Sequence, residues 1–169
     1  MKHKIVTYIW FDNGAEEAVK FYKKVFGDNL KVGGTTHYTT ETPSNKPIGS
    51  VLTVEFELFG QRFGLLNGGP YFKPNEAVSF LIECEDQKEI DKYWNALSAD
   101  PGSEMCGWLK DKYGVSWQVA PKALEAMIAS KDTEAAARAM KALLGMKKLI
   151  LADLEKAFKG PGHRLSKAG

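Results

Sequence analysis

A small group of polar residues lies on segments that otherwise read as apolar strands, and this group is the first candidate for chemistry. Its members are Glu55, Glu57, Arg62, Ser79 and Gln118. A carboxylate held in apolar surroundings has a raised pKa. It can then act as a general base, or bind a cationic or hydroxyl-bearing ligand.

The two glutamates belong to a predicted β-hairpin. Residues 51–66 alternate between apolar and polar side chains on both sides of a tight-turn signal. In this hairpin Glu57 lies opposite Arg62, and we interpret them as a cross-strand ion pair that supports the hairpin. Glu55 lies opposite Gly64, which leaves space beside its carboxylate. A catalytic or ligand-binding role for Glu55 is therefore a hypothesis, and a structural role is the alternative.

The rest of the chain supplies the elements that position this group. Apolar alternation predicts strands at 5–11, 30–40, 51–59, 61–66, 77–84, 104–109 and 114–120. Amphipathic spacing predicts one helix after residue 14 and a second at 86–97. Helix-forming composition predicts further helices near 122–129, 133–144 and 147–158, then a frayed tail from Gly160.

The first strand and helix recur later in the chain. With an offset of 72, Phe21 falls on Tyr93 and Tyr22 on Trp94. The strands align without a gap at this offset, and the later hairpins align at an offset of 54. Each half is therefore predicted to be strand, helix and three strands. A chance match between two amphipathic helices is the alternative.

Alternation with a period of two sorts the strand residues into two faces. One face is uniformly large and apolar and should pack under the helices: Tyr8, Trp10, Phe56, Leu58, Phe63, Leu65, Phe80, Ile82, Trp117 and Val119. The other mixes small, polar and apolar residues, including Thr7, Ile9, Phe11, Glu55, Gly64, Leu66, Ser79, Leu81 and Gln118. Such a face is either solvated or curved into a cup around a ligand.

Composition narrows the classes of partner. The chain has 169 residues, which suits one compact domain or two half-domains that share a core. Its 23 basic and 21 acidic residues give a net charge of +2, so we expect neither nucleic acid nor an anionic membrane as partner. No apolar run is long enough for a membrane span or a secretion signal, and we expect a cytoplasmic protein.

Cysteines and histidines give no sign of a metal or redox site. Cys84 and Cys106 form no C-x-x-C pair, and we interpret them as reduced, packed side chains, with a redox role as the alternative. The three histidines, His3, His37 and His163, are isolated from one another and are read as surface residues.

Several short sequences carry a family resemblance. They are Trp10-Phe-Asp-Asn-Gly-Ala-Glu-Glu-Ala18, Phe21-Tyr22, Leu58-Phe-Gly-Gln-Arg-Phe63, Asn67-Gly-Gly-Pro70, Cys106-Gly-Trp-Leu-Lys-Asp111 and a late segment, Met146 to Leu154. They resemble the vicinal oxygen chelate superfamily of glyoxalases, extradiol dioxygenases and antibiotic-resistance binding proteins, and most closely its PhnB-like branch, often labelled demethylubiquinone-methyltransferase-like. The most specific stretch is 106–118.

The resemblance implies an α+β fold of two βαβββ modules. Their strands would form one curved, eight-stranded mixed sheet, a glyoxalase- or bleomycin-resistance-like cup, with helices outside and usually a homodimer. We expect the first module at 1–70, the second at 71–121 and a C-terminal helical extension with its tail at 122–169.

Metal-using members of the superfamily take one ligand from the first and one from the last strand of each half. The matching positions here are Thr7, Gly64, Ser79 and Gln118, and only Gln118 is a plausible ligand. Since a divalent metal normally needs three or four protein ligands, we predict no catalytic metal and no cofactor.

The methyltransferase label also lacks its expected motif. A nucleotide-type methyl donor is usually held by a glycine-rich turn between a strand and a helix. Gly33-Gly34 and Gly68-Gly69 lie in a predicted strand and a predicted loop instead. We therefore predict no methyl transfer.

Two aromatic residues and one helical stripe complete the candidates. Trp108 and Tyr38 could line the mouth of the cup, although Trp108 is equally well read as core or dimer contact. The stripe in the C-terminal helices is interpreted as packing against the domain or a partner subunit, and it consists of Ala135, Ala139, Met140, Leu143 and Leu144.

Two classes of function stay open. The first is a metal-independent small-molecule-binding protein, with ligand-binding candidates Thr7, Glu55, Arg62, Ser79, Trp108 and Gln118. The second is a metal-independent enzyme that performs lyase- or isomerase-type acid–base chemistry on a small carbonyl-bearing or aromatic substrate, with Glu55 as the catalytic candidate. A structural dimer whose cup is filled by Phe11, Leu66 and Leu81 is a third alternative.

Overall fold

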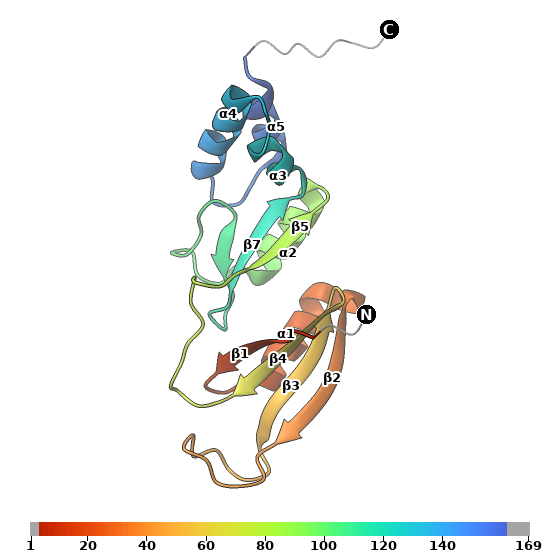
Figure 1. Cartoon of the computed structure of the whole chain (residues 1–169), viewed down its shortest axis with the longest axis vertical. Coiled ribbons are helices and arrows are strands. Elements are labelled where there is room, and N and C mark those ends of the chain that lie inside the picture. Colours follow the sequence, from red (N-terminus) through yellow and green to blue (C-terminus); the bar gives the residue numbers. More distant parts are fainter. Residues whose placement is uncertain (1–3, 162–169) are drawn as a thin grey trace. The chain divides into compact units, whose positions relative to one another are not determined.

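The computed structural model describes residues 4–161 (Figure 1). The chain divides into two compact units between Asn75 and Glu76. His3, His163 and the expected tail beyond Pro161 lie outside the described residues. Within 4–161, no helix is long and apolar enough to cross a membrane.

The first unit is a four-stranded mixed sheet with one helix. Its elements are β1 (Thr7–Phe11), α1 (Ala15–Phe26), the 3-10 turn η1 (Gly27–Asn29), β2 (Leu30–His37), β3 (Val51–Leu58) and β4 (Gln61–Asn67). The strand order is β1-β4-β3-β2, in which β1 is parallel to β4 and the other pairs are antiparallel. Helix α1 packs on one face and buries Ala18, Tyr22 and Val25.

A buried asparagine joins this helix to the sheet. The backbone N–H of Ala15 donates to Asn67 Oδ1 at 2.9 Å, which satisfies one of the N–H groups left open at a helix start. The Asn67 amide donates in turn to Glu16 Oε2 at 2.9 Å and to the Val51 carbonyl at 3.1 Å. One side chain therefore connects α1, β4 and β3.

The second unit repeats this plan with a smaller sheet. Its elements are β5 (Phe80–Cys84), α2 (Gln87–Leu97), β6 (Trp108–Lys110), β7 (Ser116–Pro121), α3 (Ala123–Ile128), α4 (Thr133–Leu144) and α5 (Leu151–Lys159). The strand order is β5-β7-β6, with β5 parallel and β6 antiparallel to β7. Helix α2 buries Ile90, Tyr93, Trp94 and Leu97.

A buried carboxylate holds the β6–β7 hairpin. Asp111 Oδ1 accepts the backbone N–H groups of Tyr113 at 2.8 Å and Val115 at 3.1 Å. Asp111 Oδ2 accepts the indole N–H of Trp117 at 2.8 Å. Asp111, in the most specific stretch of the sequence, therefore fixes the turn and the position of the Trp117 side chain.

The C-terminal helices are part of the second unit. Figure 1 shows α3, α4 and α5 grouped beyond the end of β7. A core cluster of Met127, Ala139, Leu149 and Leu154 joins them, with Ala120 of the sheet packed against it. The backbone N–H groups of residues 106 and 107 also donate to the carbonyls of residues 146 and 147, each at 2.8 Å.

The predicted stripe on these helices packs only in part. Ala135 and Ala139 are buried, and Leu143 packs against the core cluster. Met140 and Leu144 are 37% and 65% exposed, so these two residues of the stripe face outward.

The α+β class and the mixed pairing are confirmed, but an eighth strand is not formed in the described residues. Seven strands lie in two sheets of four and three. Where the repeat predicts a counterpart of β2, residues 100–103 form a turn and Met105 makes only an isolated bridge to Trp108. Pro101 and Gly102 interrupt the segment, because both disfavour a regular strand.

The predicted faces of the first strand are wrong. Phe11 is buried, while Tyr8 is 52% exposed and lies beside Gly64, on the face opposite α1. The helices align at the offset of 72. The strands align at 73, because Phe11 pairs with Asn67 of β4 and Cys84 pairs with Pro121, the equivalent residue of β7. The first strand-to-helix connection is one residue longer, and a shift of one residue exchanges the two faces of a strand.

Replacing Asp111 by Ala should destabilise the protein by about 3 kcal/mol, because three N–H groups would lose a charged acceptor in a buried place. Urea unfolding followed by tryptophan fluorescence measures this change. Lys112→Ala, at an exposed neighbouring position, serves as the control. Equal midpoints for the two variants would show that the carboxylate does not hold the hairpin.

Candidate functional site

The sheet of the second unit carries a cavity on the face that α2 leaves open. Its volume is about 360 Å³. Leu81, Gln118 and Ala120 form its floor on β5 and β7. Its wall consists of Pro121 at the end of β7 and of Leu124, Ile128 and Ala129 on and just after α3. We call this space the α3 cavity.

One polar side chain is oriented on the floor of the α3 cavity. The Gln118 amide Nε2 donates to Ser79 Oγ at 2.9 Å. This bond fixes the orientation of the amide. The other amide atom, Gln118 Oε1, has no hydrogen-bond partner within 4–161 and can accept a hydrogen bond from a ligand. Trp108 lies directly opposite Gln118 in the β6–β7 pairing. Three residues singled out in the sequence are therefore neighbours here.

The first unit carries a separate polar cluster. Tyr8 Oη donates to Glu55 Oε1 at 3.2 Å, and Arg62 Nη2 donates to Glu55 Oε2 at 3.3 Å. The Tyr8 ring lies over Gly64, where an added Cβ would come within 2.5 Å of Tyr8 Cε1. Burial raises the pKa of Tyr8, and the hydrogen bond to the Glu55 carboxylate raises that pKa further.

Two expectations about this cluster are corrected by its geometry. Arg62 pairs with Glu55, not with Glu57, although the register places Glu57 opposite Arg62 as predicted. Lys31 of β2 takes Glu57 instead, at 3.4 Å. The space expected beside Glu55 is filled by the Tyr8 ring, since the missing side chain of Gly64 makes room for it.

Sequence reasoning missed Tyr8 because it assigned the strand to the wrong face. Thr7 lies opposite Phe63, and Tyr8 takes the place beside Gly64. Tyr38 is also placed differently from the prediction: it is buried and donates to the Asn67 carbonyl at 2.6 Å. The glycine opposite Glu55 was the signal in the sequence that could have indicated Tyr8, because a missing side chain at Gly64 leaves room for an aromatic ring from the neighbouring strand.

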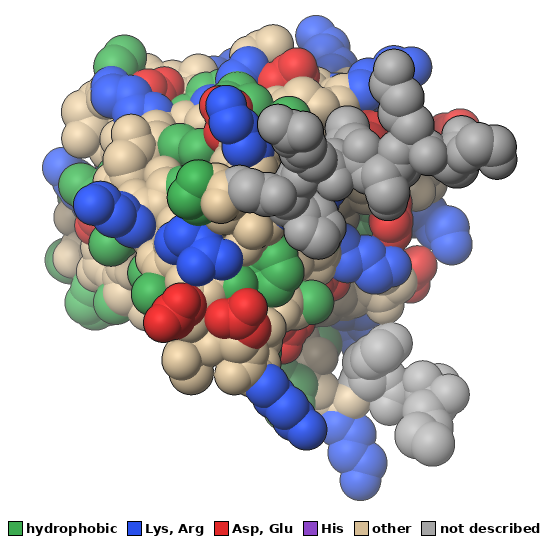
Figure 2. All heavy atoms as spheres, turned by 90° about the horizontal axis from the view of Figure 1, so that it is seen from above, with side chains coloured by type: hydrophobic (Ala, Val, Ile, Leu, Met, Phe, Trp, Pro, Cys, Tyr) green, Lys and Arg blue, Asp and Glu red, His purple; other side chains and the backbone are tan. Residues whose placement is uncertain are grey.

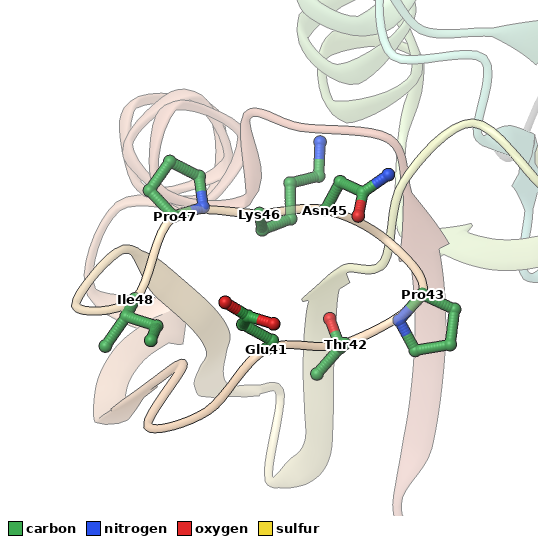
Figure 3. Close-up of a pocket in the computed structure, with 7 residues that line it drawn as sticks. All are labelled: Glu41, Thr42, Pro43, Asn45, Lys46, Pro47 and Ile48. Carbon is green, nitrogen blue, oxygen red and sulfur yellow. The ribbon is translucent and has the colours of Figure 1, made fainter.

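A second hollow is formed by one loop alone. Residues 41–48 surround a cavity of about 610 Å³, and Figure 3 shows the Glu41 carboxylate turned into this ring and the Lys46 side chain turned away from it. Lys46 Nζ donates to Asp12 Oδ1 at 3.0 Å and to Asn13 Oδ1 at 2.6 Å. The lysine therefore anchors the loop to the β1–α1 connection.

The side chains present do not fit the ligand set of a metal-using relative. Across residues 4–161, no group of three or more His, Cys, Asp or Glu is placed to hold a metal ion. Burial, then the charges of Glu89 and Asp86, raises the pKa of Cys84 to about 12, so its thiol stays protonated at neutral pH. On the face shown in Figure 2, basic and acidic side chains are interspersed with hydrophobic ones.

The glycines also do not fit a methyl-donor site. Gly33 and Gly34 lie within β2, and Gly68 and Gly69 follow β4. The β1–α1 connection contains Gly14 alone, at a φ of 88°. A glycine-rich turn between strand and helix is thus not formed at these positions.

Replacing Glu55 by Gln should lower the pKa of Tyr8 part of the way to its ordinary value, because the negative acceptor is lost while the burial of the ring remains. Titration of carbon-13-labelled tyrosine by NMR measures this pKa. Glu57→Gln is the matched control on the same strand and should leave the Tyr8 pKa unchanged. An unchanged pKa in the Glu55 variant would contradict the contact.

Comparison with known proteins adds the family. The family model for 3-demethylubiquinone-9 3-methyltransferase matches residues 3–120. A PhnB protein from Bacillus cereus, described as a putative 3-demethylubiquinone-9 3-methyltransferase, is 32% identical, with 70% of this chain and 99% of that chain covered and a TM-score of 0.57.

A second solved structure shares the fold only. Protein PA1353 from Pseudomonas aeruginosa is 18% identical, with 72% of this chain and 98% of that chain covered and a TM-score of 0.51. Among curated proteins, none matches this sequence. The match to the family model ends at residue 120, so α3, α4, α5 and the late segment Met146–Leu154 lie beyond it. This chain belongs to the 3-demethylubiquinone-9 3-methyltransferase family, the PhnB-like branch of the vicinal oxygen chelate superfamily.

Proposed function

We propose that this protein binds a small molecule in the α3 cavity and needs no metal to do so. The observation that carries the proposal is the combination of an apolar space of about 360 Å³ with one oriented amide on its floor. Ligand sites are typically concave and mostly apolar, with a few polar groups that fix the ligand's orientation. Gln118, held by Ser79, is such a group.

The side chains in the wall of the cavity should influence which ligand binds. Leu124 and Ile128 come from the C-terminal extension, which lies beyond the match to the family model. These side chains, not the shared sheet, narrow the space above Gln118. We therefore expect the ligand to be particular to proteins that carry this extension.

Metal independence and assembly belong to the same proposal. The positions that would supply metal ligands hold Thr7, Gly64, Ser79 and Gln118. In the observed register Tyr8 lies beside Gly64 on β4, and Leu81 lies beside Gln118 on β7. These residues do not offer three nitrogen or oxygen donors of the usual kind. The homodimer and the cytoplasmic location remain expectations.

Acid–base catalysis is the second candidate, and the polar cluster of the first unit favours it. The Arg62 guanidinium lies 3.3 Å from the Glu55 carboxylate and holds it in place. Tyr8 donates to the same carboxylate and presents a hydroxyl beside it. A carboxylate base next to a hydroxyl donor is an arrangement suited to proton transfer on a carbonyl-bearing substrate. The filled-cup alternative is less well supported, because Leu81 is 54% exposed.

Leu81→Trp should abolish the binding of cavity ligands, because the larger ring would occupy the floor of the α3 cavity. Thermal-shift screening of a metabolite library identifies ligands of the wild-type protein, and calorimetry compares each with the variant. Val78→Trp, at an exposed position of the same unit that does not line the cavity, is the control. A ligand that binds Leu81→Trp as tightly as wild type would place the site elsewhere.

Glu55→Gln separates the two candidate functions. If a ligand is turned over by acid–base chemistry at Glu55, we expect kcat to fall at least 100-fold, the lower range of general-base catalysis. If the protein only binds ligands in the α3 cavity, the dissociation constant should be unchanged. Steady-state turnover and calorimetry on the same preparation measure both quantities, and unaltered kcat would remove Glu55 as the base.

A further inference from the structure

The rim of the α3 cavity is acidic on two sides. Glu83 projects from β5 and Glu125 from α3, and both line the cavity. Lys122 is the basic residue among the lining side chains, and its Nζ lies 3.0 Å from Glu85 Oε1. The lysine charge is thus already matched by a carboxylate outside the lining, and two lining carboxylates remain without an ion-pair partner in the described part of the chain.

The lysine at the rim responds to the carboxylates around it. The pKa of Lys122 is raised, first by its hydrogen bond to Glu85 and in smaller part by the charge of Glu83. Glu83 and Glu85 therefore both act on the lysine at the rim of the cavity.

We propose that the α3 cavity selects an apolar ligand that carries a protonated amine. The apolar body would lie between Leu81 on the floor and Ile128 on the wall, with the ammonium group toward Glu83 and Glu125 at the rim. The Gln118 carbonyl oxygen supplies an additional acceptor for the amine hydrogens. This inference rests on the proposed function, because it concerns the ligand of the same cavity.

Charge complementarity is what distinguishes this ligand from other apolar molecules. An exposed ion pair contributes modestly, and each carboxylate should improve binding by roughly two- to five-fold. The preference should weaken with added salt, since both carboxylates are exposed to solvent and screening acts on them. An apolar carboxylate of the same size should bind least well.

Three probes of nearly equal size and shape test the charge. They are 2-phenylethylamine, 2-phenylethanol and 3-phenylpropanoate, titrated into the full chain and followed by proton–nitrogen NMR spectra. The expected order of affinity is amine, alcohol, carboxylate, with the amine at least three-fold tighter than the alcohol. The double variant Glu83→Gln with Glu125→Gln should bring amine and alcohol within a factor of two of each other.

Controls separate the charge from the cavity itself. Glu134→Gln changes an exposed glutamate of α4 in the same unit that does not line the cavity, and it should retain the preference for the amine. Leu81→Trp should remove the binding of all three probes. All of these positions are exposed, so thermal unfolding should show folded proteins.

The outcomes distinguish this inference from the proposed function. Equal binding of amine and alcohol to the wild type, lost in Leu81→Trp, would overturn the amine selectivity and leave the cavity as a binding site. A preference that survives the double glutamine variant would also overturn it, since the charge would act from elsewhere. Probe binding that is unchanged in Leu81→Trp, or absent from the wild type, would overturn both.

Discussion

The attachment of the C-terminal extension to the second sheet is the interaction on which the proposed site depends. Leu149 and Leu154 are fully buried, and burying one such side chain contributes about 1.5–3 kcal/mol. Leu149 packs close to Gly107, where an added Cβ would lie 3.1 Å from Leu149 Cδ1 and 3.0 Å from the Val119 carbonyl. Gly107 also has a φ of 85°, so the close approach and the backbone conformation both require glycine. Met127 of α3 belongs to the same core cluster, so this packing also holds the helix that forms the wall of the cavity.

Buried polar side chains do structural work in the motifs that mark the family. Asn67 closes the start of α1, and Asp111 closes the turn before β7. A polar group in such a place is expensive to bury alone, so each is surrounded by donors and acceptors that match it. The residues that carry the resemblance most strongly therefore say more about how each unit folds than about what it binds. Specificity is left to the less distinctive residues around the cavity.

Much of the fold could be predicted from the sequence because period and turn chemistry act locally. The hairpin register that places Glu55 opposite Gly64 was predicted, and so was the helix at 133–144. The faces of β1 were not, since Tyr8 and Trp10 on one side and Ile9 and Phe11 on the other are all apolar or aromatic. When both faces of a strand are apolar, the sequence does not show which face is buried. The extra residue between β1 and α1, which exchanges the two faces relative to the second unit, therefore could not be detected.

The candidate site was predictable only in part, for a reason of the same kind. Ser79 and Gln118 were named as polar residues of the mixed strand face and as matches to the metal-ligand positions of the superfamily, and their side chains do meet. The other side of the cavity depends on where α3 packs. Composition predicts a helix near 122–129, but it does not indicate what that helix packs against. The partner of Arg62 was also not predicted. Lys31, from another strand, pairs with Glu57, and Arg62 pairs with Glu55.

Mapping where small molecules bind is the most direct test of the central claim. Proton–nitrogen spectra of the full chain, recorded with neutral aromatic fragments such as 2-phenylethanol, report each backbone amide separately. The account predicts shifts concentrated at Leu81, Gln118 and Ile128, around the α3 cavity. Shifts confined to the first unit, around Tyr8 and Arg62, would contradict it.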